Sequence, residues 1–464
     1  MNPSAPSEVT PERIAGRMDR LPFLPLHLRI TSLLGIGTLF DGFDSLSIAG
    51  ALTMIIATFH IDFKSAGALG SAAFLGQIVG ALGFGWLSER IGRKWAFISS
   101  LLIFGACSLF AATASNEHEL LWARAIQGVG LGAEVPIAAA LFNEYARSAV
   151  RGKWVMLYET MFIYGLVLAP FAGLLLYSSF GPELGWRVLF GIGGIPALVA
   201  IVAIFALPES PRWLASKGRF AEADAIVTSM EEEARSRNLP LAAPVDVPPV
   251  VKESTSFFEL FRGRYAKRTF VVWTQWFCSY FVSNGFQIWQ PLLLMKIGGL
   301  PTSAALALSV ASSILQVIFA YATAGFIDRV GRVPWFSFGF GLSAVFALGG
   351  ALAGGVFHVH GWQVLVIFGF GMTSTMSVNN LGVYLFTPEQ YPTRMRAWGT
   401  AAGSSLNRLA SFIAPLAIGA LLTTGSEALT AIFVMFALVA LFGAIVMATM
   451  GEETKLRTLE ELSP

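Results

Sequence analysis

Charged residues are scarce in this chain. Asp, Glu, Lys and Arg make up 13% of its 464 residues and hydrophobic residues 55%, whereas an average soluble domain carries about 25% charged residues. The hydrophobic residues come in long blocks, and a helix needs about 20 of them to cross a bilayer. The composition therefore argues against a soluble protein and predicts an all-α membrane protein that crosses the bilayer many times.

Residues that form disulfides, metal centres and nucleotide sites are also few. Cys107 and Cys278 both lie in apolar blocks, so we expect no disulfide framework. The five histidines show no metal-ligand spacing, and the phosphate-binding pattern G-x-x-x-x-G-K-[ST] does not occur. We therefore predict no metal, no cofactor, no nucleic-acid partner and no enzyme activity. The first 27 residues contain no apolar segment of the signal-peptide kind, so the first span is expected to direct insertion.

Twelve apolar blocks are long enough to span a membrane. They lie at residues 30–58, 66–88, 96–115, 120–143, 154–179, 187–207, 268–296, 303–327, 335–355, 361–386, 397–423 and 427–450. A polar insert rich in charge and proline separates the sixth block from the seventh. We therefore predict an N-terminal six-helix bundle at 1–207, a cytoplasmic linker with short helices at 208–267, and a C-terminal six-helix bundle with a cytoplasmic tail at 268–464.

Lysine and arginine gather in alternate connections between these blocks. If the N-terminus is cytoplasmic, 26 of the 31 Lys and Arg residues fall on the cytoplasmic side. Only Lys64, Arg187 and Lys296 fall outside, and Arg124 and Arg408 lie within spans. Cytoplasmic loops of membrane proteins carry such an excess of positive charge. We therefore expect both termini in the cytoplasm, in a multi-pass protein of a cell membrane, the bacterial inner membrane.

The two halves of the chain repeat a charged loop. Residues 85–93 read G-x-x-x-E-R-x-G-R after the second block, and residues 325–332 read G-x-x-D-R-x-G-R after the eighth, at an offset of 240. Glu144 and Glu389, which end the fourth and tenth blocks, repeat at an offset of 245, and residues 208–210 are echoed at 451–453. Parallel repeats of this kind mark transporters that are built from two homologous halves.

The repeated loop resembles the signature of the major facilitator superfamily. Residues 208–214 resemble its sugar-porter and organic-ion branch, residues 41–44 (Asp-Gly-Phe-Asp) resemble aromatic-acid/proton symporters, and residues 391–396 resemble niacin-type transporters. The resemblance covers essentially the whole chain and implies twelve transmembrane helices in two pseudo-symmetric six-helix bundles. The seventh block reads Trp-Thr-Gln-Trp at 273–276 and Trp-Gln-Pro at 289–291, where sugar porters carry paired glutamines and tyrosines. This departure argues against a sugar substrate.

Four charged residues within the blocks are candidates for proton coupling. Charged side chains at membrane depth cost about 2.5–3.5 kcal/mol each on insertion scales and are retained where a pathway uses them. They are Asp41 and Asp44 on one face of the first span, and Arg124 and Glu134 on the fourth. An Asp beside an Arg is held ionised, and separation of the two lets a proton bind. The resemblance implicates the Asp44–Arg124 pair in coupling, and a static salt bridge is the alternative.

The sequence leaves two roles for Glu134: it could contact the substrate, or it could carry the proton. It follows Gly128, Gly130 and Gly132, and glycines at this spacing are expected to let two membrane helices pack closely.

Arg408, in the middle of the eleventh span, is the main candidate for substrate binding. A buried guanidinium can hold a carboxylate through two parallel hydrogen bonds, and the resemblance to organic-ion transporters implies an anionic substrate where this residue is basic. The alternative is a structural pair with Glu134 or Glu159. The other side chains expected in the substrate site, for stacking on a ring or for hydrogen bonding, are Trp276, Tyr280, Gln287, Tyr164, Tyr384 and Asn407.

Charged residues of the repeated loops and of neighbouring helix ends are expected to form a cytoplasmic gate. Their ion pairs would hold the two halves together in the outward-open state and break when the transporter opens inward. Positive charge that only sets orientation is the alternative, but it does not explain the acid–arginine spacing in both halves. The residues are Glu89, Arg90, Arg93, Glu144 and Glu209 in the first half, and Asp328, Arg329, Arg332, Glu389 and Arg396 in the second.

These features predict a proton-coupled secondary transporter that imports a small organic anion by alternating access. The expected substrate is an aromatic or heterocyclic carboxylate such as benzoate or nicotinate, with its carboxylate on Arg408. An organic-cation transporter and a proton-coupled drug exporter are alternatives, and a non-transporting nutrient sensor is the alternative from another class. The resemblance implies a monomer whose partners are a small-molecule substrate, protons and the lipid bilayer.

Overall fold

Every regular element in the described part of the chain is a helix. The structure, a computed structural model, describes residues 10–145, 151–244, 256–359 and 361–455. The first half and the linker contain α1 (Pro11–Asp19), α2 (Pro25–Phe59), α3 (Phe63–Ile91), α4 (Arg93–Ala112), α5 (Glu117–Tyr145), α6 (Arg151–Ile192), α7 (Ile195–Ala206), α8 (Pro211–Ser216) and α9 (Phe220–Ser236). The second half contains η1 (Phe257–Phe261), α10 (Gly263–Lys296), α11 (Thr302–Val330), α12 (Arg332–Gly355), α13 (Trp362–Val364), η2 (Leu365–Phe370), α14 (Gly371–Glu389), α15 (Thr393–Leu421), η3 (Leu422–Glu427) and α16 (Ala428–Met450). The predicted all-α class is confirmed.

The twelve predicted spans account for the long helices. The first four spans are α2 to α5, and the seventh to ninth, eleventh and twelfth are α10, α11, α12, α15 and α16. The fifth span and the start of the sixth are joined in α6, which breaks at Gly181, and the sixth span continues as α7. Gly181 has a φ of 73°, a left-handed conformation that glycine adopts without strain. The tenth span starts as the short α13, passes through the π-helical η2 and continues as α14.

By length and composition alone, ten stretches of the described chain are able to cross a membrane. One of them, Thr160–Ala206, holds both the fifth and the sixth predicted spans. Helix α10 is not among the ten, because polar residues such as Gln275, Ser279 and Gln287 interrupt its apolar sequence. These two features explain the difference between ten stretches and the twelve helices of the fold.

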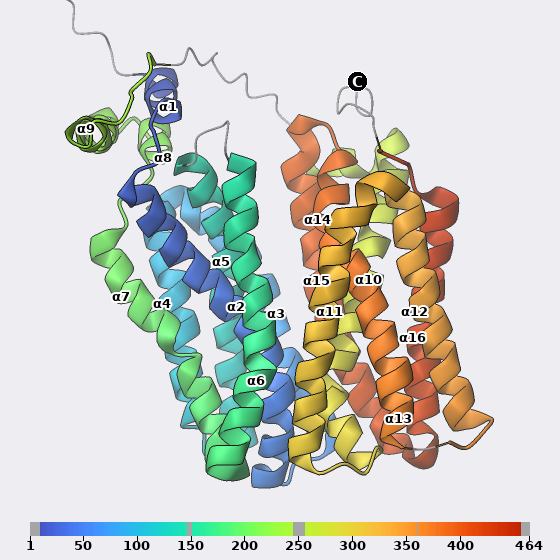
Figure 1. Cartoon of the computed structure of the whole chain (residues 1–464). Helices are drawn as coiled ribbons and strands as arrows, with labels where there is room; N and C mark the ends of the chain where they lie inside the picture. Colours follow the sequence, from blue (N-terminus) through green and yellow to red (C-terminus); the bar gives the residue numbers. More distant parts are fainter. Residues whose placement is uncertain (1–9, 146–150, 245–255, 360, 456–464) are drawn as a thin grey trace, which may run out of the picture.

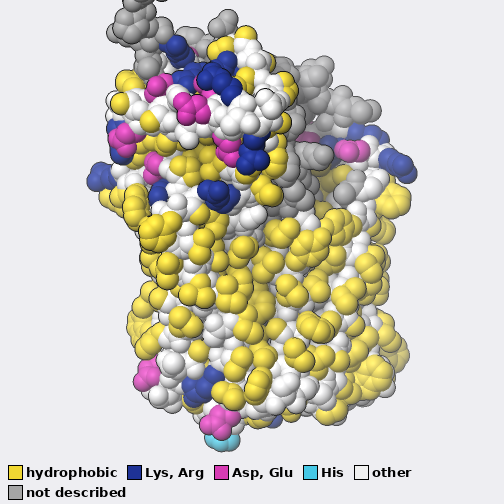
Figure 2. All heavy atoms as spheres, turned by 60° about the vertical axis from the view of Figure 1, so that its left-hand side comes forward, with side chains coloured by type: hydrophobic (Ala, Val, Ile, Leu, Met, Phe, Trp, Pro, Cys, Tyr) yellow, Lys and Arg dark blue, Asp and Glu magenta, His cyan; other side chains and the backbone are white. Residues whose placement is uncertain are grey.

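Many large apolar side chains are exposed on the long helices. Leu82, Trp122, Leu198, Phe205 and Leu438 are all more than half exposed. On the face that Figure 2 shows, hydrophobic side chains form a broad band, and most of the charged side chains gather at the end above it. Such a surface is unfavourable in water and matches the hydrocarbon core of a bilayer. It is the surface of a multi-pass membrane protein.

The helices form two bundles that stand side by side (Figure 1). Helices α2 to α7 make the first bundle and α10 to α16 the second. The short helices α1, α8 and α9 lie beyond one end of the first bundle, which we call the linker end. The predicted cytoplasmic position of both termini would place the linker end in the cytoplasm.

The two bundles touch each other near the end opposite the linker end. Gly67 of α3 lies against α15, where a Cβ on Gly67 would come within 2.9 Å of the Pro415 carbonyl oxygen. Phe63 meets Trp289 of α10 edge-on, with ring centroids 6.3 Å apart. Gly419 of α15 approaches the same segment, because its Cβ would lie 2.6 Å from the Phe63 carbonyl oxygen. The bundles are therefore closed against each other at this end.

Glycines bring α3 and α5 into backbone contact inside the first bundle. A Cβ on Gly76 would lie 1.9 Å from the carbonyl oxygen of Ala125, and a Cβ on Gly128 would lie 2.0 Å from that of Ala73. Small residues allow membrane helices to approach this closely. The glycines that precede Glu134 therefore serve close packing, as the sequence predicted.

Helix α1 is held on the linker helix α9 by two arginines. Arg17 donates to both carboxylate oxygens of Glu231, at 2.9 and 3.0 Å, and Arg20 donates to the same carboxylate at 2.7 Å. Burial acts to raise the pKa of Glu231, but the hydrogen bonds from Arg17 and Arg20 outweigh it and lower the pKa below its ordinary value of 4.5. The ionised carboxylate therefore stabilises the docked α1.

Gly128→Ala should destabilise the first bundle, because the added methyl group would overlap the backbone of Ala73 on α3. We expect the apparent melting temperature of the purified protein to fall by about 5 °C or more. Gly83→Ala is the matched control, since a Cβ at that position of α3 has no atom within 4 Å. Equal melting temperatures for the two variants would contradict the contact.

Glu231→Gln should loosen α1 at neutral pH, because it removes the charge that Arg17 and Arg20 bind. In the wild type this stabilisation is complete above the ordinary pKa of 4.5 and is lost as the pH falls through the lowered pKa. We expect amide hydrogen exchange in α1 to rise about tenfold in the variant at pH 7. Glu222→Gln changes an exposed pair with Arg219 on the same helix and should leave that exchange unchanged. Equal rates of amide hydrogen exchange in α1 for the two variants would contradict the stabilising role of Glu231.

Candidate functional site

Asp44 and Arg124 form a buried ion pair inside the first bundle. Nη1 of Arg124 donates to both carboxylate oxygens of Asp44, at 2.7 and 2.9 Å, and the two side chains are 3% and 1% exposed. Gln127 completes the network, since it accepts from Arg124 and donates to Asp44, each at 2.8 Å. The sequence prediction missed Gln127, although its place one turn after Arg124 on the same helix face was a usable signal.

Glu134 is fully buried between α2 and α5 of the first bundle. Its Oε1 accepts from the hydroxyl of Thr38 at 3.2 Å, and it lies against Gly37, where a Cβ would come within 2.8 Å of it. These neighbours belong to the same half as Glu134. A role in proton transfer or substrate contact stays a prediction.

Arg408 is a buried cation in the middle of α15. The residue is 9% exposed, and its Nη1 donates to the hydroxyl of Ser404 at 2.7 Å. Its Nε has no hydrogen-bond partner among the described residues. The titratable groups that act on it electrostatically are Asp41, from α2 of the other half, and Tyr280 and Tyr384 of its own half. Arg408 is therefore a cation at the boundary between the halves that keeps a donor for an anion.

Neither structural pair proposed as an alternative for Arg408 is found in the described chain. Asp41, rather than Glu134, is the carboxylate that acts on the guanidinium. The side chain of Glu159 lies outside the described residues.

Three aromatic side chains accompany Arg408. Trp276 and Tyr280 of α10 stack with ring centroids 5.8 Å apart, and Tyr384 of α14 meets Trp276 edge-on at 4.9 Å. The hydroxyl groups of Tyr280 and Tyr384 are 3.5 Å apart, and Tyr384 is 50% exposed. These two tyrosines can meet a ring-bearing ligand.

Trp276 departs from its predicted role in ligand stacking. It is fully buried, and its indole N–H donates to the hydroxyl of Thr387 at 2.9 Å. In this conformation Tyr384 is half exposed, and Trp276 packs against both tyrosines from the buried side. Tyr164 lies on α6 of the other half with half of its side chain exposed, and its stacking role stays a prediction.

Asn407 belongs to a hydrogen-bonded network within the second bundle. Its Oδ1 accepts from the hydroxyl of Ser411 at 3.1 Å, and the Ser411 oxygen accepts from Asn284 of α10 at 2.7 Å. This network fixes α10 against α15, the two helices that carry Tyr280 and Arg408. Asn407 therefore positions the site in this conformation, and direct contact with substrate stays a prediction.

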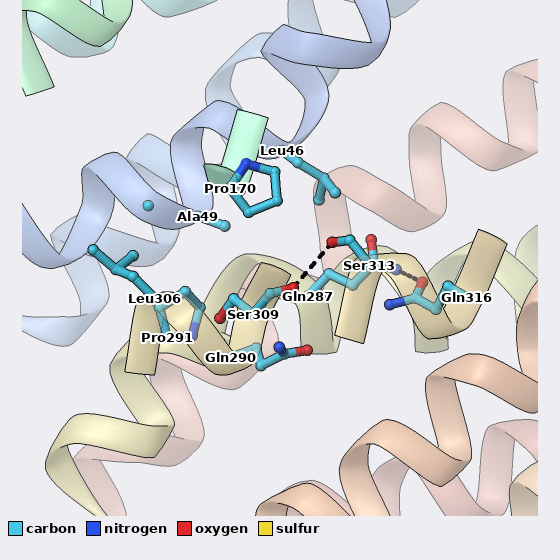
Figure 3. Close-up of a pocket in the computed structure, with 11 residues that line it drawn as sticks. Leu46, Ala49, Pro170, Gln287, Gln290, Pro291, Leu306, Ser309, Ser313 and Gln316 are labelled. Carbon is cyan, nitrogen blue, oxygen red and sulfur yellow. Dashed lines mark hydrogen bonds between the residues drawn. The ribbon is translucent and has the colours of Figure 1, made fainter. Parts of the chain in front are cut away.

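Gln287 lines a recess between the two halves (Figure 3). The recess has about 310 Å³ of space that atoms do not fill, part of it open to solvent. Its walls are Leu46, Ala49 and Gly50 of α2, Pro170 of α6, Gln287, Gln290 and Pro291 of α10, and Leu306, Ser309, Ser313 and Gln316 of α11. Gln287 donates to Gln316 across this wall. The amide and hydroxyl groups can bond the uncharged polar part of a substrate.

Four of the five predicted gate residues of the first half form one cluster at the linker end, and Arg90 lies outside it. Arg93 donates to Glu89 at 2.6 Å and to Glu144 at 3.0 Å. Glu209 accepts from the backbone N–H groups of residues 93 and 94, at 2.9 and 3.1 Å. Burial raises the pKa of Glu209 above its ordinary value, against the lowering effect of these backbone hydrogen bonds.

The second half repeats the same arrangement. Arg332 donates to Asp328 at 2.7 Å and to Glu389 at 2.9 Å. Glu453 accepts from the backbone N–H groups of residues 332 and 333, both at 3.0 Å. Glu453 was not among the predicted gate residues, although the echo of residues 208–210 at 451–453 pointed to it.

Each charge cluster joins helices of one half only. The ion pairs of Arg93 connect α3, α4 and α5, and those of Arg332 connect α11, α12 and α14. Arg90 lies over the ring of Trp86 on its own helix, at 3.9 Å, and the remaining gate residues bond within the second half, Arg396 to the Pro388 carbonyl and the Arg329 carbonyl to Lys455. The two halves contact each other at the opposite end. A gate that bridges the halves stays a prediction.

The protein has two membrane-embedded bundles, a charge cluster repeated in the loops of both, and buried charges near the boundary between them. These features define a transporter of the major facilitator fold. A sequence model described as "Sugar (and other) transporter" matches residues 30–464. The chain belongs to this family.

Known relatives agree with that assignment. The chain is 32% identical to the niacin transporter NiaP of Acinetobacter baylyi, over 97% of this chain and 99% of that protein. It is 26% identical to the galactose-proton symporter of Escherichia coli, over 93% and 92%. Among solved structures, the xylose transporter XylE from E. coli in a partially occluded inward open conformation shares the fold, with a TM-score of 0.71 at 19% identity over 94% of this chain and 100% of that one. These relatives are transporters and not enzymes.

Arg124→Ala should strongly destabilise the protein, because Asp44 would stay buried with only Gln127 to bond it. Breaking a buried ion pair from one side costs about 3–5 kcal/mol, so we expect the apparent melting temperature to fall by about 5 °C or more. The double variant Asp44→Asn/Arg124→Gln removes both charges at similar volume and should recover most of the loss. A double variant as unstable as the single one would mean that the charge pair is not what stabilises this contact.

Proposed function

We propose that this transporter imports a small aromatic or heteroaromatic carboxylate, of the benzoate or nicotinate class, together with protons. Arg408 is the observation that carries the proposal. It is a buried guanidinium at the boundary of the halves whose Nε has no partner among the described residues. A carboxylate can complete its hydrogen bonding in the bidentate geometry that a guanidinium favours.

The surroundings of Arg408 support a flat ring on the substrate. Tyr280 and Tyr384 lie beside the cation, and Tyr384 is half exposed. Aromatic rings pack on one another in offset-stacked or edge-to-face geometry with centroids about 4.5–7 Å apart. The similarity to a niacin transporter supports the same substrate class.

Proton coupling is assigned to the network of Asp44, Arg124 and Gln127. In this structure Arg124 donates to both carboxylate oxygens of Asp44. A conformational change that separates them leaves a buried carboxylate that binds a proton, so protonation and conformation are linked. Import of a monoanion with more than one proton would also be driven by the membrane potential, at about 2.3 kcal/mol per charge per 100 mV.

A neutral polyhydroxyl substrate is the second candidate. The recess beside Gln287, Gln290 and Gln316 offers amide groups without charge, and a galactose-proton symporter is among the relatives. Such a substrate would leave Arg408 with no anion to bind, so a variant at this position separates the two candidates.

The purified protein should be stabilised against heat by nicotinate and benzoate, and the Arg408→Ala variant should not. At a concentration of about 100 times Kd, a ligand adds about 2.7 kcal/mol to the stability of the folded state. Nicotinamide is the matched control ligand, because it keeps the ring and lacks the charge. Uptake of radiolabelled nicotinate into proteoliposomes with an inward proton gradient then tests transport, its direction and its coupling.

Other outcomes would exclude the anion. Stabilisation of wild type and Arg408→Ala alike by galactose would favour the neutral substrate. Stabilisation of both by an organic cation would make Arg408 a structural residue. Ligand-driven efflux would favour the drug exporter, and binding without accumulation in proteoliposomes would favour a sensor.

A further inference from the structure

Exposed aromatic and basic side chains gather directly before the seventh span. The short helix η1, which precedes α10, leaves Phe258 68% exposed and Phe261 43% exposed. Arg262, Arg264 and Lys267 follow around the start of α10, and all three are exposed. We call these five residues the basic-aromatic segment.

The segment is held in place on the second bundle. Leu260 of η1 is fully buried, and its carbonyl oxygen accepts from the hydroxyl of Thr269 at 2.8 Å. The ring of Phe257 packs edge-on against Phe261 and against Trp398 of α15, with centroids 5.5 and 5.7 Å apart. Trp398 is itself 46% exposed. The folded structure therefore keeps a group of aromatic rings at the surface beside the cations.

Positive charge is in excess around these rings. Glu259 of η1 is bound to Arg394, and Glu452 is bound to the buried Arg268 at 2.7 Å. Together with the three cations of the basic-aromatic segment, five cations lie beside two carboxylates, and both carboxylates are bound to arginines outside the segment. The surface therefore complements an anionic partner.

Orientation of the chain in the membrane does not account for this surface. Positive charge in a short cytoplasmic loop orients a membrane protein, but that effect requires no exposed aromatic rings beside the charge. The gate clusters occur in both halves, whereas residues 20–29, which lie before the first span, contain two arginines, and one of them, Arg20, is bound to Glu231. The basic-aromatic segment is therefore a feature of the second half alone.

We propose that the basic-aromatic segment binds the headgroup of an anionic phospholipid in the membrane leaflet at the linker end. The three cations meet the negative charge of the headgroup. Phe258 and Phe261 enter the layer between headgroups and acyl chains, where aromatic side chains of membrane proteins gather. The bound lipid then holds the start of α10, the helix that carries Tyr280 of the candidate site. This inference does not depend on which substrate is transported.

Binding of phosphatidylglycerol and of phosphatidylcholine to the delipidated full-length protein in detergent tests the proposal by native mass spectrometry. Each cation near an anionic lipid surface contributes about fivefold in affinity, so the wild type should bind phosphatidylglycerol at least about tenfold more tightly than phosphatidylcholine. The triple variant Arg262→Gln/Arg264→Gln/Lys267→Gln should lose this preference. Raising the ionic strength should weaken the preference of the wild type, because salt screens exposed charges.

The matched control is Arg219→Gln/Arg235→Gln/Arg237→Gln, which removes three exposed cations of the linker. It should keep the preference for phosphatidylglycerol. Equal affinity of the wild type for the two lipids, or an equal loss of preference in both triple variants, overturns the proposal. Displacement of phosphatidylglycerol by the same concentration of inorganic phosphate would make this a site for free phosphate and overturns the lipid as its occupant.

The aromatic part of the surface has its own test. Phe258→Ala should weaken the binding of both lipids about threefold, because the ring meets the part of the molecule that the two lipids share. Its exposure predicts an unchanged melting temperature. Phe205→Ala changes an 86% exposed phenylalanine of α7 and should leave the affinity unchanged. Equal affinities for Phe258→Ala and the wild type would exclude the ring from the lipid site and overturn the proposal in this form.

Discussion

A charge buried at membrane depth must be met by another polar group, and the site of this protein depends on where each buried charge finds one. Asp44, Arg124 and Gln127 meet each other within the first bundle, so their network needs no group from the second bundle. Among the described residues of its own half, Arg408 donates hydrogen bonds to Ser404 alone. Its remaining hydrogen bonds and its charge therefore depend on the other half or on a ligand, and this dependence makes it the point where binding and movement can be linked.

The repeated loop motif follows from a single geometry that occurs twice. Glu209 and Glu453 accept hydrogen bonds from the first N–H groups of α4 and α12, where a carboxylate also meets the positive end of the helix dipole. The glycine of each motif has a φ of 98° or 107°, and a side chain there would run into the carboxylate. The arginine that follows binds the acids of its own half, so each cluster first ties its own bundle together.

Part of the site could be predicted from the sequence, because a charged side chain has a high free-energy cost in the hydrocarbon core of a membrane. Asp44, Arg124 and Arg408 stand out as charges inside apolar blocks, and the first two do form a pair. Gln127 carries no charge and was missed. Trp276 was expected to meet the ligand but is buried behind Tyr280 and Tyr384, because the rotation of α10 about its axis is set by its packing against α14 and α15. Composition does not contain that information.

The sequence by itself determined the helices, their number and the half of the chain to which each belongs. Lipid admits only backbone that satisfies its own hydrogen bonds, so apolar blocks of sufficient length have to be helices. Only the tertiary structure decided which of the two carboxylates pairs with Arg124. Asp41 and Asp44 are three residues apart and alike in sequence, yet Asp44 bonds to Arg124 inside its bundle and Asp41 takes no part in that network. Helix tilt and rotation, which neighbouring helices impose, separate their roles.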